Sequence, residues 1–146
     1  MAIRLTNKNV IDTLSDVAVG ITYPFSSNGG SLFTLNYTTK DQAVSNLKNL
    51  LLTRKGERYM LPTFGSRIPD FLFEQITDET LASLESSISA DIAFWLPYIN
   101  IVSISVTQNE RNANLIAIKI DFQVGNDNAN TSIILNVGPD QNIILQ

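Results

Sequence analysis

The chain has 146 residues, of which 44% are hydrophobic, a size and composition that fit one domain with its own core. It contains no cysteine and no histidine, which excludes disulfides, thiolate catalysis, Ser-His-Asp and Cys-His mechanisms, and the two commonest side-chain metal ligands. The formal net charge is −4, so a basic surface for nucleic acid is not expected.

Residues 1–19 are predicted to form either a short amphipathic helix or an arm that orders on a partner. The helix is suggested by the helical spacing of Val10, Ile11, Leu14 and Val17, and the arm is supported about equally. Residues 1–10 contain no continuous apolar stretch, so no secretory signal is expected. No apolar run in the chain approaches the ~20 residues of a membrane span, so a membrane partner is not expected either.

From residue 21 to residue 37 the pattern changes to that of two strands. Apolar residues occupy every second position on both sides of a polar break, as Ile21, Tyr23, Phe25, Phe33, Leu35 and Tyr37. The break contains Asn28-Gly29, a pair typical of hairpin turns because both residues tolerate positive φ. Pro24 cannot donate to a ladder, so the first strand is expected to be an edge or to end early.

The first long helix is predicted to begin near Thr39, where Thr39 and Gln42 have capping-box spacing. Its buried stripe is expected to be Val44, Leu47 and Leu51, flanked by Ala43 and Leu50. Gly56 is suited to the C′ position, and Arg54 and Lys55 suit the negative end of the helix dipole.

Residues 57–76 are interrupted by two prolines and a glycine, yet they are rich in apolar side chains. A loop this apolar must pack on something, so a compact connector is expected. A place in the core is predicted for Phe64, Phe71, Phe73 and Trp95, with a place in an interface as the alternative. Arg58 either pairs with Glu57 at the surface or is half-buried and ties the connector to the helix end.

A second helix is predicted from Thr77 or Asp78 to Trp95, and Pro97 stops it. One face of this helix is expected to carry Leu81, Leu84, Ile88, Ile92 and Trp95.

The remaining chain alternates in β fashion over residues 102–107, 116–124 and 133–137. Val102, Ile104 and Val106 are expected to share one face. Such alternation favours an antiparallel meander with one buried face. Residues 142–146 are either a short edge strand or a tail that waits for a partner. The predicted fold class is α+β, with two main helices packed on a small antiparallel β meander and an N-terminal β hairpin. The predicted domain spans residues 20–146 and follows the arm.

The segment from residue 47 to residue 74, LKNLLLTRKGERYMLPTFGSRIPDFLFE, resembles a known family. It is similar to the baseplate wedge and sheath-initiator proteins of contractile-tailed phages and related injection systems, the "lysozyme-like" wedge proteins. The family pattern is a helix ending in Leu-x-Thr-x-x-Gly-Glu-Arg, then Pro-x-Phe-Gly, then Leu-Phe-Glu. The likeness extends over about residues 20–138. The matching positions are Leu51, Thr53, Gly56, Glu57, Arg58, Pro62, Phe64, Gly65, Leu72, Phe73 and Glu74.

The chain departs from the family after the second helix. Many members carry Glu-Pro-Arg there, whereas this chain has Leu96-Pro97-Tyr98, and only Pro97 is retained. Contacts of the missing acid and base are therefore not carried over. If that triplet anchors a neighbouring wedge subunit, the neighbour of this chain should differ.

The resemblance implies a structural subunit of the tail baseplate that initiates sheath assembly by β-strand exchange with sheath subunits. It implies as partners the tail sheath protein and other baseplate wedge proteins, with the baseplate hub or tube as a further candidate. The implied location is the virion tail baseplate, after assembly in the host cytoplasm. No catalytic residue, cofactor, metal or small-molecule substrate is expected.

Two other functions remain open. A glycan-cleaving tail enzyme would need two carboxylates roughly 5–9.5 Å apart across a cleft. Glu57, Asp70, Glu74 and Asp91 are available for this role, but none lies in a recognisable motif. A transient assembly adaptor, absent from the finished particle, fits the sequence equally, and the residues do not distinguish a phage from another contractile injection system.

Overall fold

The structure of the chain is a computed structural model that describes residues 10–14, 16–23, 25, 33–71, 74–109, 112–125, 130–137 and 144–145. It begins with a short 3₁₀ helix and ends with four strands. The elements are η1 (Val10–Thr13), β1 (Gly20–Ile21), β2 (Leu35–Asn36), α1 (Thr39–Leu52), α2 (Ile68–Phe71), α3 (Asp78–Trp95), β3 (Ile99–Asn109), β4 (Asn112–Val124), β5 (Thr131–Val137) and β6 (Ile144–Leu145).

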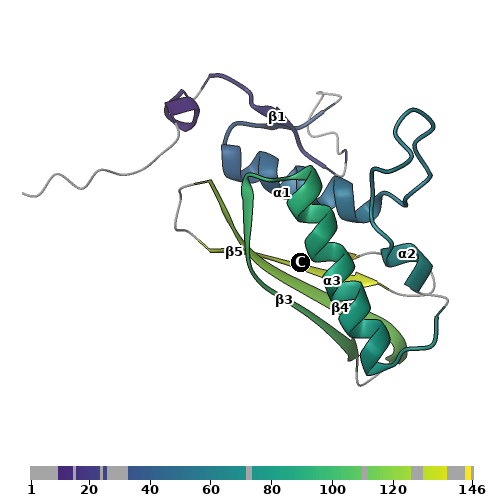
Figure 1. The fold of residues 1–146 in the computed structure, drawn as a ribbon. Helices are drawn as coiled ribbons and strands as arrows, with labels where there is room; N and C mark the ends of the chain where they lie inside the picture. Colours follow the sequence, from purple (N-terminus) through teal and green to yellow (C-terminus); the bar gives the residue numbers. More distant parts are fainter. Residues whose placement is uncertain are drawn as a thin grey trace, which may run out of the picture.

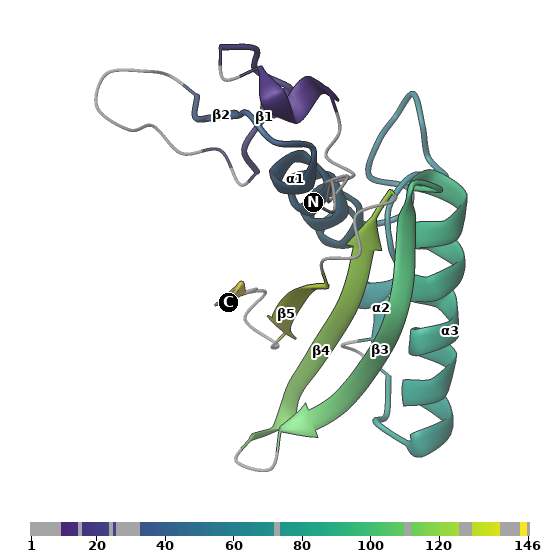
Figure 2. The ribbon, with the colours of Figure 1, turned by 90° about the vertical axis from the view of Figure 1, so that its left-hand side faces the viewer.

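The α+β class predicted from the sequence is confirmed. One antiparallel sheet has the order β3-β4-β5-β6, and β1 and β2 form a separate antiparallel pair. The three α-helices lie on one side of the larger sheet, and Figure 2 shows its opposite face with no helix in front of the strands (Figures 1 and 2). Among the described residues no helix combines the length and apolarity that crossing a bilayer requires.

The core lies between this sheet and the helices, where the register aligns apolar side chains across strands. Ile120 on β4 pairs with Ile104 on β3 and with Ile133 on β5. Because side chains alternate between the two faces of a sheet, this row and the rows two residues away point to the helices. The most deeply buried side chains are Leu47, Leu50, Leu51, Leu84, Ile88, Ile92, Ile118, Ile120, Phe122, Leu135 and Val137.

The prediction for the start of β3 is wrong at Val102. A β-bulge lies between Ile101 and Ser103, so the alternation changes phase there. Ile101, Ile104 and Val106 pack against the core, whereas the side chain of Val102 is 53% exposed.

The predicted ends of α1 also need correction. Its N-cap is Thr38, whose hydroxyl accepts a hydrogen bond from the Asp41 backbone N–H, so the cap lies one residue before the predicted Thr39. The helix ends at Leu52, and the chain is extended at Thr53. Gly56 is therefore not the C′ residue, although it does have a positive φ of 87° in the following turn.

The second helix was predicted correctly, and Pro97 follows it as expected. α3 starts at Asp78 after the N-cap Thr77, whose hydroxyl accepts from the Thr80 N–H. The predicted connector contains a short helix, α2, that the sequence pattern did not indicate. Phe71 is buried within it, Phe64 is half-buried, and Phe73 lies outside the described residues.

The predicted hairpin is present but short, because β1 and β2 pair over only Gly20↔Asn36 and Ile21↔Leu35. The predicted turn at residues 26–30 lies outside the described residues. At the other end of the chain, Ile144 and Leu145 form the short edge strand β6 beside β5.

Candidate interaction surfaces

The connector between α1 and α2 is joined to the end of α1 by backbone hydrogen bonds. Ser66 donates to the Thr53 carbonyl at 2.8 Å, and Lys55 donates to the Ser66 carbonyl at 3.2 Å. The buried Ser66 hydroxyl donates to the Leu51 carbonyl at 2.7 Å. Gly65 has φ of 122°, and a Cβ there would lie 2.5 Å from the Thr53 carbonyl oxygen, so this position requires glycine.

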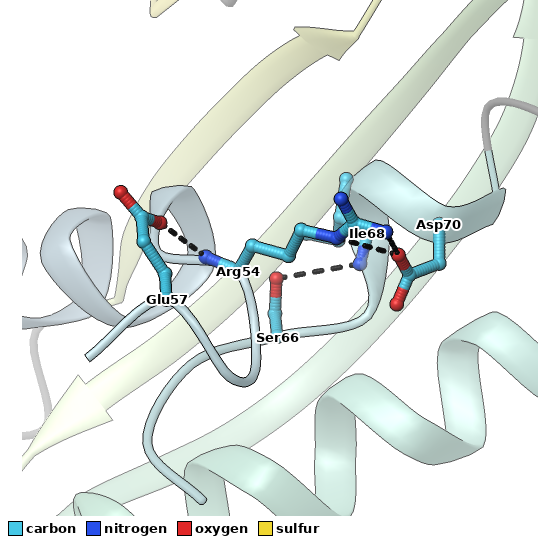
Figure 3. Close-up of polar contacts among 5 residues, drawn as sticks. All are labelled: Arg54, Glu57, Ser66, Ile68 and Asp70. Carbon is cyan, nitrogen blue, oxygen red and sulfur yellow. Dashed lines mark hydrogen bonds and ion pairs between the residues drawn. The ribbon is translucent and has the colours of Figure 1, made fainter. Parts of the chain in front are cut away.

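The acidic and basic residues at the base of the connector hold its turn (Figure 3). The Glu57 carboxylate accepts from the Arg54 backbone N–H at 3.0 Å. The Arg54 guanidinium pairs with Asp70 on α2, with Nη2 2.6 Å from Oδ1. Because this pair is largely exposed, it contributes about 0–1 kcal/mol to stability. The Glu57 carboxylate acts as a turn-forming group, because it accepts from the backbone three residues earlier.

Arg58 is half-buried and contacts α1, which is one of the two arrangements that the sequence left open. Its Nη2 donates to the Asn49 side-chain oxygen at 3.0 Å, and its guanidinium lies 4.0 Å from the centroid of the Phe64 ring. Phe64 in turn meets Trp95 of α3 edge-on, with centroids 5.2 Å apart. This stack links the connector to both long helices.

A second ion pair, between Lys55 and Asp91, was not foreseen from the sequence. Lys55 Nζ lies 2.5 Å from Asp91 Oδ1, and the Asp91 side chain is only 12% exposed. Its other oxygen, Oδ2, is buried without a hydrogen-bond partner. The sequence contains one sign of a buried acid, because Asp91 stands next to Ile92 and about one turn after Ile88, on the buried side of α3.

The other motif residues do not converge on one cleft. The Pro62 carbonyl accepts from the Gly56 N–H at 2.8 Å, which closes the connector loop. Glu74 and Pro97 are exposed. Leu72 and Phe73 lie outside the described residues. The motif therefore braces the connector. Three of the four candidate catalytic carboxylates already have partners: Glu57 accepts from the Arg54 N–H, Asp70 pairs with Arg54, and Asp91 pairs with Lys55.

The free border of β3 is a separate surface. In the described part of the chain β3 pairs only with β4, so its outer backbone groups face no neighbouring strand. A groove of about 860 Å³ runs between this border and α3. Its helix side carries alanine and serine side chains, with Glu85 as the larger exception. The groove is lined by Ala82, Glu85, Ser86, Ser89, Ala90, Ala93, Ile101, Val102, Ser103 and Ile104.

The sheet face that lacks helices carries a polar row across three strands. Asp121 on β4 accepts from the Ser132 hydroxyl on β5 at 2.5 Å and from the Ser103 hydroxyl on β3 at 2.9 Å. These two hydroxyl groups, together with Lys119 on the same strand, lower the pKa of Asp121 below its ordinary value of 3.8. No group of three or more acidic side chains among the described residues is placed to hold a metal ion.

The N-terminal hairpin presents its apolar side chains to solvent. Phe25 and Phe33 are 65% and 50% exposed, and their rings are in edge contact at 5.9 Å. The opposite side of the hairpin is polar and lies on α1. There the buried Asn36 amide donates to Gln42 at 3.0 Å and to the Ser45 hydroxyl at 2.9 Å.

Three solved structures share this fold. A candidate tail lysozyme from Geobacter sulfurreducens is 23% identical, with a TM-score of 0.63, and the match covers 77% of this chain and 96% of that chain. A chain of the anti-feeding prophage baseplate is 24% identical, with a TM-score of 0.64 and coverages of 73% and 84%. A chain of the type VI secretion system baseplate complex is 17% identical, with a TM-score of 0.54 and coverages of 65% and 88%.

At these identities the three structures show likeness of fold alone. Comparison with curated protein sequences gives no match. The family model of the baseplate wedge protein gp25, however, matches residues 38–129, which include the connector, α3, β3 and β4. The chain therefore belongs to the gp25 baseplate wedge protein family.

Proposed function

We propose that this chain is a non-catalytic baseplate wedge subunit that initiates the tail sheath by adding a strand of a sheath subunit to the free border of β3. The observation that carries the proposal is the outer side of β3, a strand of 11 residues, with which no other strand pairs among the described residues. An unpaired strand border offers rows of backbone donors and acceptors, and main-chain hydrogen bonds to an added strand supply affinity.

The composition of β3 supports this role. Soluble proteins usually protect an exposed border with charged residues or proline, because an open border recruits other chains. β3 reads INIVSISVTQN and contains neither a charged residue nor a proline. The opposite border differs, since β6 covers β5 at Leu135 and Asn136. Of these two borders, β3 is therefore the better acceptor.

The groove beside β3 gives an added strand the space that it needs. Alternate side chains of a strand point to opposite faces, so those of an added strand that point to the helices would enter this groove. Apart from Glu85, the residues of α3 that line it are alanines and serines, whose side chains are small. Bulky side chains at these positions would leave no room.

The proposal assigns no catalytic role to the carboxylates. Glu57, Asp70 and Asp91 are engaged in a turn and in two ion pairs, which is a structural use of their charge. The partners that follow are the sheath protein and other baseplate proteins, including wedge proteins and the hub or tube. The proposed location is the tail baseplate of a phage or a related contractile injection system, after assembly in the host cytoplasm.

We also propose that residues 20–146 form a single sheath-initiator-like domain, preceded by an arm of residues 1–19. The support is the polar contact of the hairpin with α1 through Asn36 and Ser45, which ties the hairpin to the helical layer. The arm itself contacts the start of the same helix, where Asp12 accepts from the Thr39 N–H at 2.7 Å.

A proline scan over residues 103–107 tests strand addition. Successive residues of an edge strand point their N–H groups alternately to the neighbouring strand and outward. Proline at an outward position is tolerated by the monomer but removes a donor to an added strand. We expect these variants to keep the wild-type thermal transition and to enter baseplates normally, yet to nucleate no sheath when mixed with sheath subunits. Electron microscopy of the mixtures gives the readout.

The scan contains its own control, because proline at the alternate positions breaks the β3–β4 ladder and should lower the thermal transition. Sheath growth at the wild-type rate on every folded proline variant would overturn strand addition at β3.

Two further measurements test the alternative functions, a glycan-cleaving enzyme and a transient adaptor. Cleavage of peptidoglycan that is lost in Glu57→Gln or Glu74→Gln would establish an enzyme, and absence of the chain from mature particles by mass spectrometry would establish a transient adaptor.

A further inference from the structure

The most exposed apolar side chains among the described residues lie at the tip of the connector. Tyr59 is 95% exposed and Met60 is 88% exposed, and Leu61 follows them. We call Tyr59, Met60 and Leu61 the connector patch; in Figure 1 the loop projects from the body between α1 and α2. At the base of the loop, Phe64 is in edge contact with Trp95, and Trp95 is in edge contact with the exposed Phe94 of α3.

The tip is held outward by the fold. The Leu61 N–H donates to the Arg58 carbonyl at 3.2 Å, and the Phe64 N–H donates to the Leu61 carbonyl at 3.1 Å. Arg58 is fixed against Asn49 and Phe64 at the base. A loop braced in this way cannot fold its apolar side chains back onto the core, so they remain exposed in the isolated chain. Tyrosine has only two side-chain torsions, so Tyr59 loses little conformational entropy on binding, which makes it an effective anchor.

We propose that the connector patch inserts into an apolar pocket of a neighbouring baseplate protein, and that carboxylates at the rim of this pocket meet Arg58 and Arg67. The charge distribution supports an acidic rim. Arg54 and Lys55 are already paired with Asp70 and Asp91, whereas Arg58 and Arg67 have no carboxylate partner among the described residues. Both guanidinium groups instead lie near aromatic rings of the connector, with donors available to a partner.

A protein pocket fits this chemistry better than a lipid surface does. Attraction to anionic lipid grows with the number of free basic groups near the surface. The connector retains only two such groups, and the chain as a whole has a net charge of −4. The proposal rests on the chain being a baseplate component and is independent of strand addition.

The test replaces Tyr59 and Met60 by serine in the full chain. Both side chains are almost fully exposed, so the thermal transition should stay within about 1–2 °C of wild type, a small effect of the size expected for surface changes. Loss of two anchors should lower the amount of the chain in purified baseplates about tenfold or more. Arg67→Glu should lower it further at low salt, where charge pairing is strongest. The control variant is Lys40→Ser, an exposed change on α1, which should leave incorporation unchanged.

A photo-crosslinking residue at position 59 then identifies the occupant. We expect crosslinks in assembled baseplates to one other baseplate protein, at an apolar site with carboxylates around it, and none from position 40. Normal incorporation of the serine variant would overturn the proposal. Crosslinks to a second copy of the chain, or binding of the wild type to phosphatidylserine vesicles that the serine variant loses, would also overturn it. Loss of strand addition can be distinguished from loss of the connector contact. The β3 proline variants should still enter baseplates and lack only the sheath, whereas the serine variant should fail to enter baseplates.

Discussion

The two antiparallel regions of this chain have the same alternating pattern but bury opposite sides. In the meander, the apolar residues of β4 and β5 face the helices and the polar residues form the open face. In the hairpin, the polar residues Thr22 and Asn36 lie toward α1, and Ile21 and Leu35 are exposed. Alternation therefore predicts a two-sided strand but does not say which side is buried.

The cause of the difference lies in α1, which contacts both regions. One side of this helix carries Leu47, Leu50 and Leu51, which are buried in the core with the sheet. Another side carries Gln42 and Ser45, which bond to Asn36 of the hairpin. A helix surface with hydroxyl and amide groups is best satisfied by a polar strand face, since a buried polar group without a partner costs about 1–3 kcal/mol.

The largest effect is expected from matched Phe→Ala changes in the two regions. Phe122 on β4 is fully buried, so Phe122→Ala should lower the free energy of unfolding by about 3–5 kcal/mol. Phe33 beside the hairpin is half-exposed, and Phe33→Ala should cost far less, about 1 kcal/mol or below. Urea denaturation of both variants measures the contrast. Equal losses would mean that the exposed side of the hairpin is covered in solution.

The second effect concerns the polar contact itself. Asn36→Ala removes the amide that donates to Gln42 and Ser45 and accepts from the Thr22 hydroxyl, and the loss of these bonds should cost roughly 1–3 kcal/mol. We expect the loss to be local, so amide hydrogen exchange should accelerate in residues 20–36 and stay unchanged in β4. Acceleration in β4 to the same degree would show that the hairpin and the meander unfold as one unit.

Much of the fold was predictable because it follows from periodicity. The stripe of α3, the three meander strands and the stop at Pro97 are all encoded locally. The bulge at Val102 was not predictable, since no glycine or proline marks it. The cap of α1 was placed one residue late because Thr38 and Thr39 are both suitable residues, and only the Asp41 contact distinguishes them.

The candidate site was predictable in position but not in detail. The family motif located the connector, and the structure adds how it is braced. The Lys55–Asp91 pair joins residues 36 positions apart, and no local pattern reports such a contact. The free border of β3 depends on which strands pair with which, and pairing is decided by the whole fold rather than by one segment.

The third effect is a pH dependence on the open face of the meander. Because the Ser132 and Ser103 hydroxyls hold the pKa of Asp121 below its ordinary value of 3.8, the folded state favours the ionised carboxylate. Its contribution to stability is therefore complete above pH ~4, and it is lost as the pH falls through the lowered pKa. Asp121→Asn should flatten this part of the acid-unfolding curve, and a curve with unchanged slope below pH 4 would contradict the assignment.

The smallest effect is expected where exposed apolar side chains of the hairpin are replaced. Leu35→Thr introduces a β-branched residue into β2 and removes an apolar group that is already 44% exposed, so the free energy of unfolding should change by no more than about 0.5 kcal/mol. Solubility at high protein concentration should rise, because the apolar surface available for association is smaller. The matched change in the meander, Leu135→Thr, alters a fully buried residue and should be strongly destabilising. A large loss from Leu35→Thr in the isolated chain would mean that this side of the hairpin packs against the chain itself, and the inverted orientation of the hairpin would then be wrong.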